Sequence, residues 1–259
     1  MERLNARAFA EVTSAEREVA DQLPIEAEPR EARAVLARVP YWFHTFALNR
    51  GEGIYTPGTA RDHRYRLQAI PADFSGLSVL DVGAFDGFYA FLAEARGAAR
   101  VVAVDNEQYV HWVRDRWGAE LEGGEGFDAI AELLASRVEY RHLDAFELDR
   151  LDERFDLIVC CGILHRVEAP GRLLEVLRCS LNPGGRVLLE THGVFAQPDD
   201  GDPVHRYGPG EVYPDDEYVY WGFTPAGIET IARPLGYTRF ELVDAPLIDG
   251  HPRLIGWLS

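Results

Sequence analysis

The chain has 259 residues, of which 47% are hydrophobic, enough for one large α/β domain with an extension or for two small domains. Its net charge of −17, with arginine as the sole basic residue type, argues against a broad nucleic-acid surface, which would need a basic face. No apolar run is long enough to cross a bilayer, so no membrane partner is expected.

The first residues are charged, so no signal peptide is predicted and the cytoplasm is the expected compartment. Cys160, Cys161 and Cys179 form no C-x-x-C pair. We therefore expect reduced thiols and no metal site.

Residues 1–69 are predicted to form an extension ahead of a main domain over 70–259. Apolar residues recur at helical spacing through 1–39, and a short amphipathic helix is predicted over 61–70. These helices either pack against the main domain or cover a cleft, and packing is the simpler interpretation.

Aromatic side chains crowd the predicted loop over 40–58. Trp42 and Phe43 lie there beside His44. One interpretation is a small satellite core with a satisfied histidine. The other is a wall of a substrate pocket, in which His44 is a base or a hydrogen-bond partner.

From residue 78 onward, predicted strands alternate with predicted helices. The strands are Ser78–Val82, Arg100–Asp105, Val138–Leu143, Phe155–Cys161, Arg186–Thr191, about Thr238–Asp244 and about Arg253–Leu258. The helices between them are Phe88–Arg96, Gln108–Trp117, Phe127–Ala135, Gly171–Ser180 and Thr224–Pro234. This alternation predicts a mostly parallel sheet covered on both faces, with ligands at the carboxyl ends of the strands.

The segment Val79–Phe91, VLDVGAFDGFYAF, reads as a strand, a glycine turn and the start of a helix. Gly83 and Gly87 permit a sharp bend and a close approach of a ligand, and Asp81 stands near the end of the strand. The D-x-G-x-x-x-G spacing differs from the G-x-G-x-x-G of dinucleotide sites. A carboxylate here suits a cationic ligand such as S-adenosylmethionine (SAM). The alternative is an ordinary strand–helix turn.

Two further carboxylates follow neighbouring strands. Asp105, twenty-four positions after Asp81, is predicted to accept hydrogen bonds from ribose hydroxyls, the alternative being a helix N-cap. Asp144, followed by Ala145, is predicted to accept from an adenine amino group, the alternative being a turn residue.

Together these segments resemble a class I SAM-dependent methyltransferase over about residues 70–259. The resemblance rests on VLDVGAFDG, VVAVD, the aspartate after the third strand, FDLIVCCGILHRV and LNPGGRVLLET. It implies a Rossmann-like, seven-stranded, mostly parallel sheet with an antiparallel last strand. Phe85 stands where the family often has a third glycine.

The wording VGAFDGFYAF, with WFHTFAL and TPG upstream, resembles a narrower subgroup. That subgroup is allied to the transfer-RNA uridine carboxymethyltransferases and to methyltransferases of sugar and natural-product pathways. Its G-x-L-Y-H run reads Gly162-Ile163-Leu164-His165-Arg166 here, so His165 takes the tyrosine position and Arg166 the histidine position.

The resemblance implies SAM as cofactor, S-adenosylhomocysteine (SAH) as product and an in-line displacement. The expected cofactor contacts are Asp81, Gly83, Ala84, Phe85, Gly87, Asp105, Asn106, Asp144, Ala145, Cys161 and Gly162. His165 is the first candidate for the general base, because it lies at the end of the fourth predicted strand, where the methyl group must be. His44 and His192 are the other candidates, since an unperturbed histidine titrates near neutrality. For each the alternative is a hydrogen-bonded structural histidine.

A long insertion over 193–223 follows the fifth strand and is predicted to contribute to the acceptor site. The expected acceptor contacts are Trp42, Phe43, Arg166, Glu190, Tyr213, Tyr220 and Trp221. The acidic side chains of the insertion could hold a divalent ion, but a solvated acidic loop is the preferred interpretation.

The leading functional prediction is O-methylation of a small molecule, a sugar or secondary metabolite, with a histidine as general base. The first alternative is a transfer-RNA-modifying enzyme that uses a carboxylated cofactor held by Arg166 or Arg206. The second is a SAM-binding module without catalysis. The leading prediction implies a small molecule as the partner, and a nucleic-acid partner is not expected. Whether the chain forms a homo-oligomer is left open.

Overall fold

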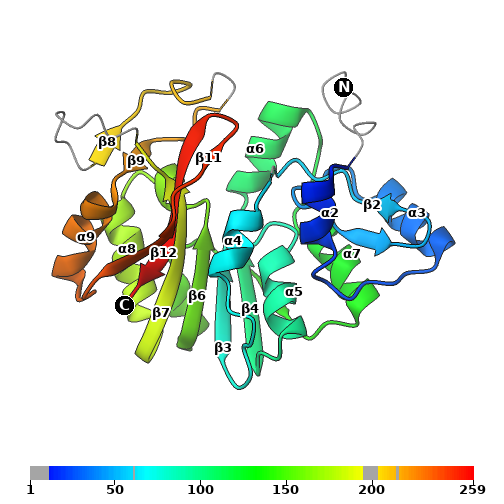
Figure 1. Cartoon of the computed structure of the whole chain (residues 1–259), viewed down its shortest axis with the longest axis horizontal. Helices are drawn as coiled ribbons and strands as arrows, with labels where there is room; N and C mark the ends of the chain where they lie inside the picture. The colour runs from blue at the N-terminus through cyan, green and yellow to red at the C-terminus, as the bar shows by residue number, and fades with distance from the viewer. Residues whose placement is uncertain (1–11, 61, 195–203, 214–215) are drawn as a thin grey trace.

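A mixed sheet forms the centre of the computed structural model, which describes residues 12–60, 62–194, 204–213 and 216–259 (Figure 1). Its strands are β3 (Ser78–Val82), β4 (Arg100–Asp105), β5 (Glu139–His142), β6 (Phe155–Cys161), β7 (Leu181–His192), β10 (Phe240–Asp244) and β12 (His251–Leu258). They lie in the order β10-β12-β7-β6-β3-β4-β5, and β11 (Leu247–Ile248) pairs with β12. The strands from β7 to β5 are parallel, whereas β12 runs antiparallel to both of its neighbours, which confirms the expected fold class.

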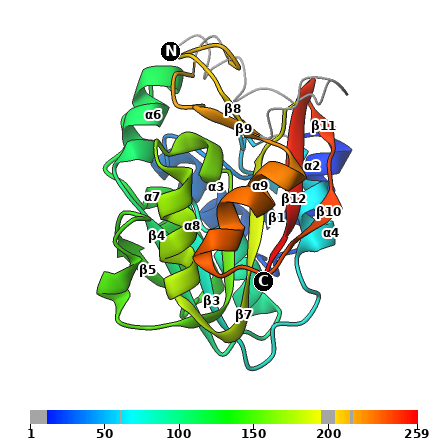
Figure 2. The ribbon, with the colours of Figure 1, turned by 90° about the vertical axis from the view of Figure 1, so that its left-hand side faces the viewer.

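Helices cover both faces of this sheet. They are α5 (Phe88–Ala95), α6 (Gln108–Trp117), α7 (Glu125–Leu134), α8 (Pro170–Cys179) and α9 (Pro225–Ala232). Val79 and Val101 pack in the hydrophobic cluster that contains α5 and α7. Leu80 and Val102, the next residues along each strand, pack with α8 and α9, which lie side by side in Figure 2. This alternation follows from the two-residue period of a strand.

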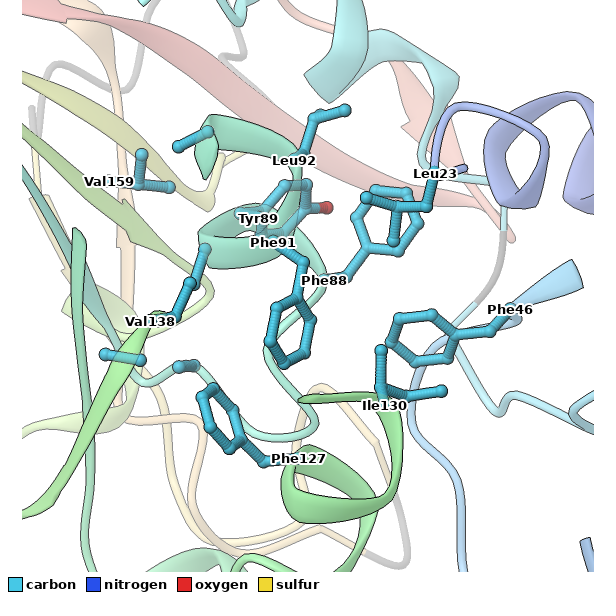
Figure 3. Packing of buried hydrophobic residues seen from close by; sticks show 14 of the residues in the cluster. Leu23, Phe46, Phe88, Tyr89, Phe91, Leu92, Phe127, Ile130, Val138 and Val159 are labelled. Carbon is cyan, nitrogen blue, oxygen red and sulfur yellow. The ribbon is translucent and has the colours of Figure 1, made fainter. Parts of the chain in front are cut away.

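The extension shares its core with the sheet. It contains α2 (Ser14–Ala20), α3 (Pro29–Arg38), the hairpin strands β1 (Ala47–Asn49) and β2 (Ile54–Tyr55), and α4 (Arg64–Ala69). Figure 3 shows Leu23 and Phe46 of the extension in the cluster of Phe88 and Phe91 from α5. Part of the predicted aromatic loop is therefore a β-hairpin, a pairing that periodicity over so few residues does not indicate.

Two segments near β7 differ from the predicted boundaries. Residues 181–185 lie between the predicted helix Gly171–Ser180 and the predicted strand Arg186–Thr191, yet they form the first part of β7, and the pairing with β6 is irregular there. The insertion, for which no strand was predicted, contains the short strands β8 (Val204–Arg206) and β9 (Trp221–Phe223). β8 and β9 lie at the same end of the molecule as α6 and β11 (Figure 1).

Some predictions fall outside the described residues. They concern the first helix around Leu4, Ala8 and Phe9 and the acidic side chains of Asp199, Asp200, Asp202 and Asp215. Within the described ranges no helix is long and apolar enough to span a membrane. In the same ranges no three His, Cys, Asp or Glu side chains are grouped as metal ligands would be.

Candidate active site

A cleft of about 1090 Å³ opens at the carboxyl ends of the parallel strands. It brings together most of the predicted site residues. The lining includes the predicted contacts Gly83, Phe85, Asp105, Asn106, Asp144, Ala145, Cys161, Gly162, His165, Arg166, Phe43, Tyr213 and Tyr220. The predicted residues that do not line it are Asp81, Ala84, Gly87, His44, His192, Trp42, Glu190 and Trp221.

The loop after β3 adopts left-handed backbone conformations at three positions. Gly83 has φ +75° and Gly87 has φ +81°, and a Cβ on Gly83 would stand 2.2 Å from the Ile163 side chain. Phe85 has φ +57°, a conformation unusual for a bulky residue. Its ring stacks on Phe43 with 4.6 Å between the ring centres, so packing against the extension holds this strained residue in the cleft wall.

The carboxylate of Asp105, at the end of β4, is held by two backbone N–H groups. It accepts the backbone N–H groups of Phe85 at 2.7 Å and Asn106 at 2.9 Å, one on each oxygen. Each oxygen keeps a further lone pair, so two acceptor positions remain for a pair of hydroxyls. Burial raises the pKa of Asp105 to about 7, which two hydroxyl donors would counteract.

Asp144 forms the adjoining end of the cleft. It accepts the side-chain amide of Asn106 at 2.6 Å and the backbone N–H of Phe146 at 2.8 Å. Leu143, Ala145 and Phe146 add apolar surface beside it. A carboxylate bordered by apolar side chains fits a flat base that carries an amino group, as expected for adenine.

Asp81 lies beneath the loop and does not line the cleft. It is 2% exposed and accepts the backbone N–H of Ala90 at 3.1 Å. Ala90 is the third residue of α5, and the N-cap position is Gly87, which has no side chain to cap the helix. Burial raises the pKa of Asp81 to about 7. Its predicted contact with the cofactor ammonium stays a prediction, and the contact that the structure gives it is the helix cap.

The three histidine candidates have different surroundings. His165 lines the cleft, and its Nδ1 is 3.4 Å from the His192 backbone N–H and 3.3 Å from Thr191 Oγ1. Because a backbone N–H can only donate, Nδ1 is an acceptor and the ring proton lies on Nε2. Burial lowers the pKa of His165 well below its ordinary value, so the ring is neutral.

His192 reaches the cleft only through another side chain. Its Nε2 is 3.1 Å from the hydroxyl of Tyr213, which lines the cleft. Burial lowers the pKa of His192 to about 2. Neither His165 nor His192 is therefore charged at neutral pH.

His44 is enclosed in the protein. Its Nδ1 hydrogen-bonds Asp86, which also accepts the backbone N–H groups of Phe43 at 2.9 Å and His44 at 2.8 Å. Its Nε2 is buried and has no hydrogen-bond partner among the described residues. This arrangement ties the extension to the loop after β3 and leaves His44 without contact to the cleft.

Glu190 accepts hydrogen bonds from three neighbouring side chains. One oxygen accepts Arg66 at 2.8 Å, and the other accepts Arg253 at 2.6 Å and Tyr65 at 2.9 Å. Burial alone would raise the pKa of Glu190, but Arg253 and Arg66 lower it to about 2. Both arginines and Tyr65 line the cleft, whereas Glu190 itself is fully buried.

The insertion reaches α6 through Asp216. This buried carboxylate accepts Trp112 Nε1 at 3.2 Å and Arg166 at 3.1 Å. Burial alone would raise the pKa of Asp216, but Arg166 and these hydrogen bonds hold that pKa below its usual range. Of the other predicted acceptor contacts, Trp42 packs in the core, and Trp221 donates to the carbonyl of Val167 at 2.9 Å.

The cleft also contains residues that the sequence did not indicate as site residues. Among them are His63, Tyr65, Arg66, Trp112, Asp216 and Arg253. The sequence TPG, which is part of the resemblance, lies shortly before His63, and this could have indicated His63 as a site residue. The partners of the other five lie far away in sequence, so no local pattern marks them.

Comparisons with known proteins agree with this architecture. A family model described as methyltransferase domain matches residues 56–233. A tRNA U34 carboxymethyltransferase of Campylobacter hominis is 31% identical over 187 residues, which cover 72% of this chain and 59% of that protein. The enzyme of the same name from Desulfotalea psychrophila is 24% identical over 242 residues, covering 92% of this chain and 69% of that one. The chain thus spans about three-fifths to two-thirds of these two relatives.

Two solved structures have the same architecture. The N-terminal domain of EvdMO1, in the presence of SAH and D-fucose, has a TM-score of 0.63 at 19% identity, covering 90% of this chain and 97% of that one. Burkholderia thailandensis 1,6-didemethyltoxoflavin-N1-methyltransferase, with its substrate and SAH bound, has a TM-score of 0.51 at 25% identity, covering 71% of each chain. The chain therefore belongs to the methyltransferase domain family, with the class I fold whose cofactor is SAM.

Proposed function

We propose that this chain transfers a methyl group from SAM to an oxygen of a small molecule, in the class of sugars and secondary metabolites. The observation that carries the proposal is that one cleft is lined by two kinds of side chain. Asp105 and Asp144 supply carboxylate acceptors, and Phe43, Trp112 and Tyr213 supply aromatic faces. The carboxylates suit a nucleoside, and the aromatic faces suit a flat ring or a sugar.

The bridge from Asp216 to Trp112 and Arg166 favours a small acceptor. It joins the insertion to α6 through residues that line the cleft, so an acceptor too large for the space beside it would have to break it. Ligand pockets are commonly about 300–1,000 Å³. A cleft of about 1090 Å³, just above that range, can hold a nucleoside cofactor together with a small acceptor.

The cofactor supplies an electrophilic methyl group on a sulfonium. The chain has to hold the acceptor oxygen in line with that group, which contributes on the order of 7–11 kcal/mol in well-oriented reactions. The acceptor proton must leave as the new oxygen–carbon bond forms and the carbon–sulfur bond breaks. A positioned base contributes roughly 10²–10⁴-fold to such a step.

Among the predicted bases, His165 remains the first candidate because it lines the cleft. Because Nδ1 accepts the His192 backbone N–H, His165 would act through Nε2. It would either donate the Nε2 proton to the acceptor oxygen and so orient it, or act as a base once that proton has left Nε2. His192 would act only through the Tyr213 hydroxyl. The enclosure of His44 with Asp86 makes it the weakest candidate.

Two measurements test this proposal. Calorimetry should detect binding of SAM and SAH, and mass spectrometry should then detect a methylated product from a panel of sugars and hydroxylated metabolites. The proposal fails if neither cofactor form binds at about millimolar concentration. It also fails if SAM binds but only a transfer RNA is modified.

A second function, carboxymethyl transfer to transfer RNA, is favoured by one specific observation. Arg253 is buried and lines the cleft, and its terminal nitrogens have no hydrogen-bond partner among the described residues. It suits an additional carboxylate better than the predicted Arg166, which is paired with Asp216, or Arg206, which stacks on Trp221. The names of the relatives point the same way.

The two functions differ in their cofactor and in their dependence on salt. A carboxymethyl transferase should bind carboxylated SAM much more tightly than SAM, and an Arg253→Met variant should abolish the preference. Its affinity for transfer RNA should fall steeply as salt rises. A small-molecule methyltransferase should prefer SAM and show no such RNA binding.

A further inference from the structure

His63 is a histidine of the cleft to which no role has been assigned above. It is 4% exposed, lies directly before α4 and lines the cleft. Its Nδ1 is 2.7 Å from the hydroxyl of Tyr89, and its Nε2 makes no hydrogen bond with a described residue. The buried nitrogens without partners include Nε2 of His44 but not that of His63, so the His63 nitrogen is open to the cleft.

The neighbours of His63 fix which nitrogen carries the proton. Arg66 Nη1 donates to the Tyr89 oxygen at 3.2 Å, and a guanidinium can only donate. The Tyr89 proton has no other described acceptor than His63 Nδ1. Nδ1 is therefore the acceptor and Nε2 carries the proton. Burial, and then the nearby His44 and Arg66, lower the pKa of His63 well below its ordinary value, so the ring is neutral.

This relay is anchored at its far end. Arg66 donates to Glu190 at 2.8 Å and to the Tyr65 hydroxyl at 3.1 Å, and it is itself buried. The orientation of His63 thus depends on a fixed guanidinium, and a donor held in place loses little entropy when it binds a ligand.

The position of the relay identifies the part of the cofactor that it faces. A Cβ on Gly162 would stand 3.9 Å from Arg66 Nη2, so the relay lies at the end of β6, next to β3 and its Gly83 turn. Asp105 and Asp144 lie on the other side of β3, after β4 and β5. A nucleoside with its ribose at Asp105 and its base toward Asp144 would therefore extend its amino-acid chain toward the Gly83 turn and His63.

We propose that the Nε2–H of His63 binds the α-carboxylate of the methionine half of the cofactor, with Tyr89 and Arg66 as positioning residues. A carboxylate offers only acceptors, which complements the N–H that the relay keeps on this nitrogen. The inference requires the cofactor alone and holds for either acceptor class, so its failure is separable from failure of the proposed function.

The test compares two ligands that differ in the amino-acid part. SAH carries the carboxylate, whereas 5′-methylthioadenosine has the same nucleoside thioether without it. Calorimetry should show that His63→Ala weakens SAH about 10- to 100-fold, the range for a hydrogen bond to a charged group, and changes methylthioadenosine less than about twofold. The exposed His111→Ala is the control and should change neither affinity. Equal losses for both ligands, or no loss for either, would overturn the proposal.

Two further variants keep the proposal testable if His63→Ala does not fold. His63→Gln places an amide nitrogen near the Nε2 position and should retain more SAH affinity than His63→Asn. Tyr89→Phe removes the donor to Nδ1, so ¹⁵N NMR should show the Nε2–H tautomer of His63 in the wild type and a mixture in the variant. An Nδ1–H tautomer in the wild type would contradict the relay.

Discussion

Arg66 of α4 and Glu190 of β7 form a buried ion pair, with 2.8 Å between Nη2 and Oε2. The pair joins the extension to the central sheet at the floor of the cleft, and Arg253 completes it on the other oxygen. Because both arginines line the cleft while Glu190 is enclosed, the carboxylate positions two cations that a ligand can reach.

Glu190→Gln should destabilise the protein strongly. It leaves two buried guanidinium groups without their anion, a change that costs about 3–5 kcal/mol when one member of a buried pair is removed. Urea denaturation measures the free energy of unfolding. The matched control is Glu241→Gln, which breaks the exposed pair with Arg239 and should cost about 0–1 kcal/mol. Equal costs for the two variants would contradict the proposed importance of the buried pair.

The same carboxylate predicts a pH dependence of stability. The pKa of Glu190 is lowered to about 2 in the folded protein, against about 4.3 for an unperturbed glutamate. A carboxyl group whose pKa is lower in the folded state than in the unfolded state stabilises the fold at pH values above its unfolded-state pKa. That stability is lost as the pH falls from about 4.3 toward about 2. Acid titrations of the wild type and of Glu190→Gln should converge in this window, and parallel curves would argue against the assignment.

Cofactor affinity should depend on the protonation of Asp105. Burial raises its pKa to about 7, and the ionised form is the better acceptor for two ribose hydroxyls. The dissociation constant for SAH should rise by up to about tenfold per pH unit as the pH falls below about 7. Asp105→Asn should bind SAH weakly and without this slope. A slope that persists in Asp105→Asn would assign the titration to another group, such as Asp81.

Asp216 should hold the insertion over the cleft. Asp216→Ala removes the acceptor of Trp112 and Arg166, so limited proteolysis should cut the insertion several times faster than in the wild type. The neighbouring Glu217→Ala is the matched control, because Glu217 is exposed. Identical cleavage rates for the two variants would show that Asp216 does not hold the insertion in place.

His165 should affect turnover without affecting cofactor binding. With an acceptor in hand, His165→Asn should lower kcat by roughly 10²–10⁴-fold and leave the dissociation constant for SAH unchanged. Its lowered pKa keeps the ring neutral, so His165 should add no limb to the kcat profile near pH 6.5. The exposed His205→Ala is the control. A loss of SAH affinity equal to the loss of kcat would indicate a cofactor contact instead.

The strands and helices nearest the loop after β3 were predictable from local sequence. β3, β4, β6 and α6 have the predicted bounds, because each is a strong periodic or apolar segment that ends at a glycine, an aspartate or a turn. The place of Asp105 and Asp144 in the cleft was predictable because the carboxyl ends of parallel strands meet at one edge, whereas their contacts with a cofactor stay predictions.

The pairings that complete the site were not predictable in this way. Arg66 meets Glu190 across 124 positions, and Trp112 meets Asp216 across 104. Such contacts depend on how α4, α6 and the insertion dock, which no local period encodes. Asp81 has the predicted place in the strand, yet the docking of α5 points its carboxylate at Ala90.

A crystal structure of the chain with SAH bound shows whether this cleft is the cofactor site. We expect the ribose hydroxyls to bind Asp105, adenine to lie beside Asp144 and the α-carboxylate to lie at His63. An SAH molecule bound outside this cleft, or bound in it without contact to Asp105, would show that the cofactor site is a different one.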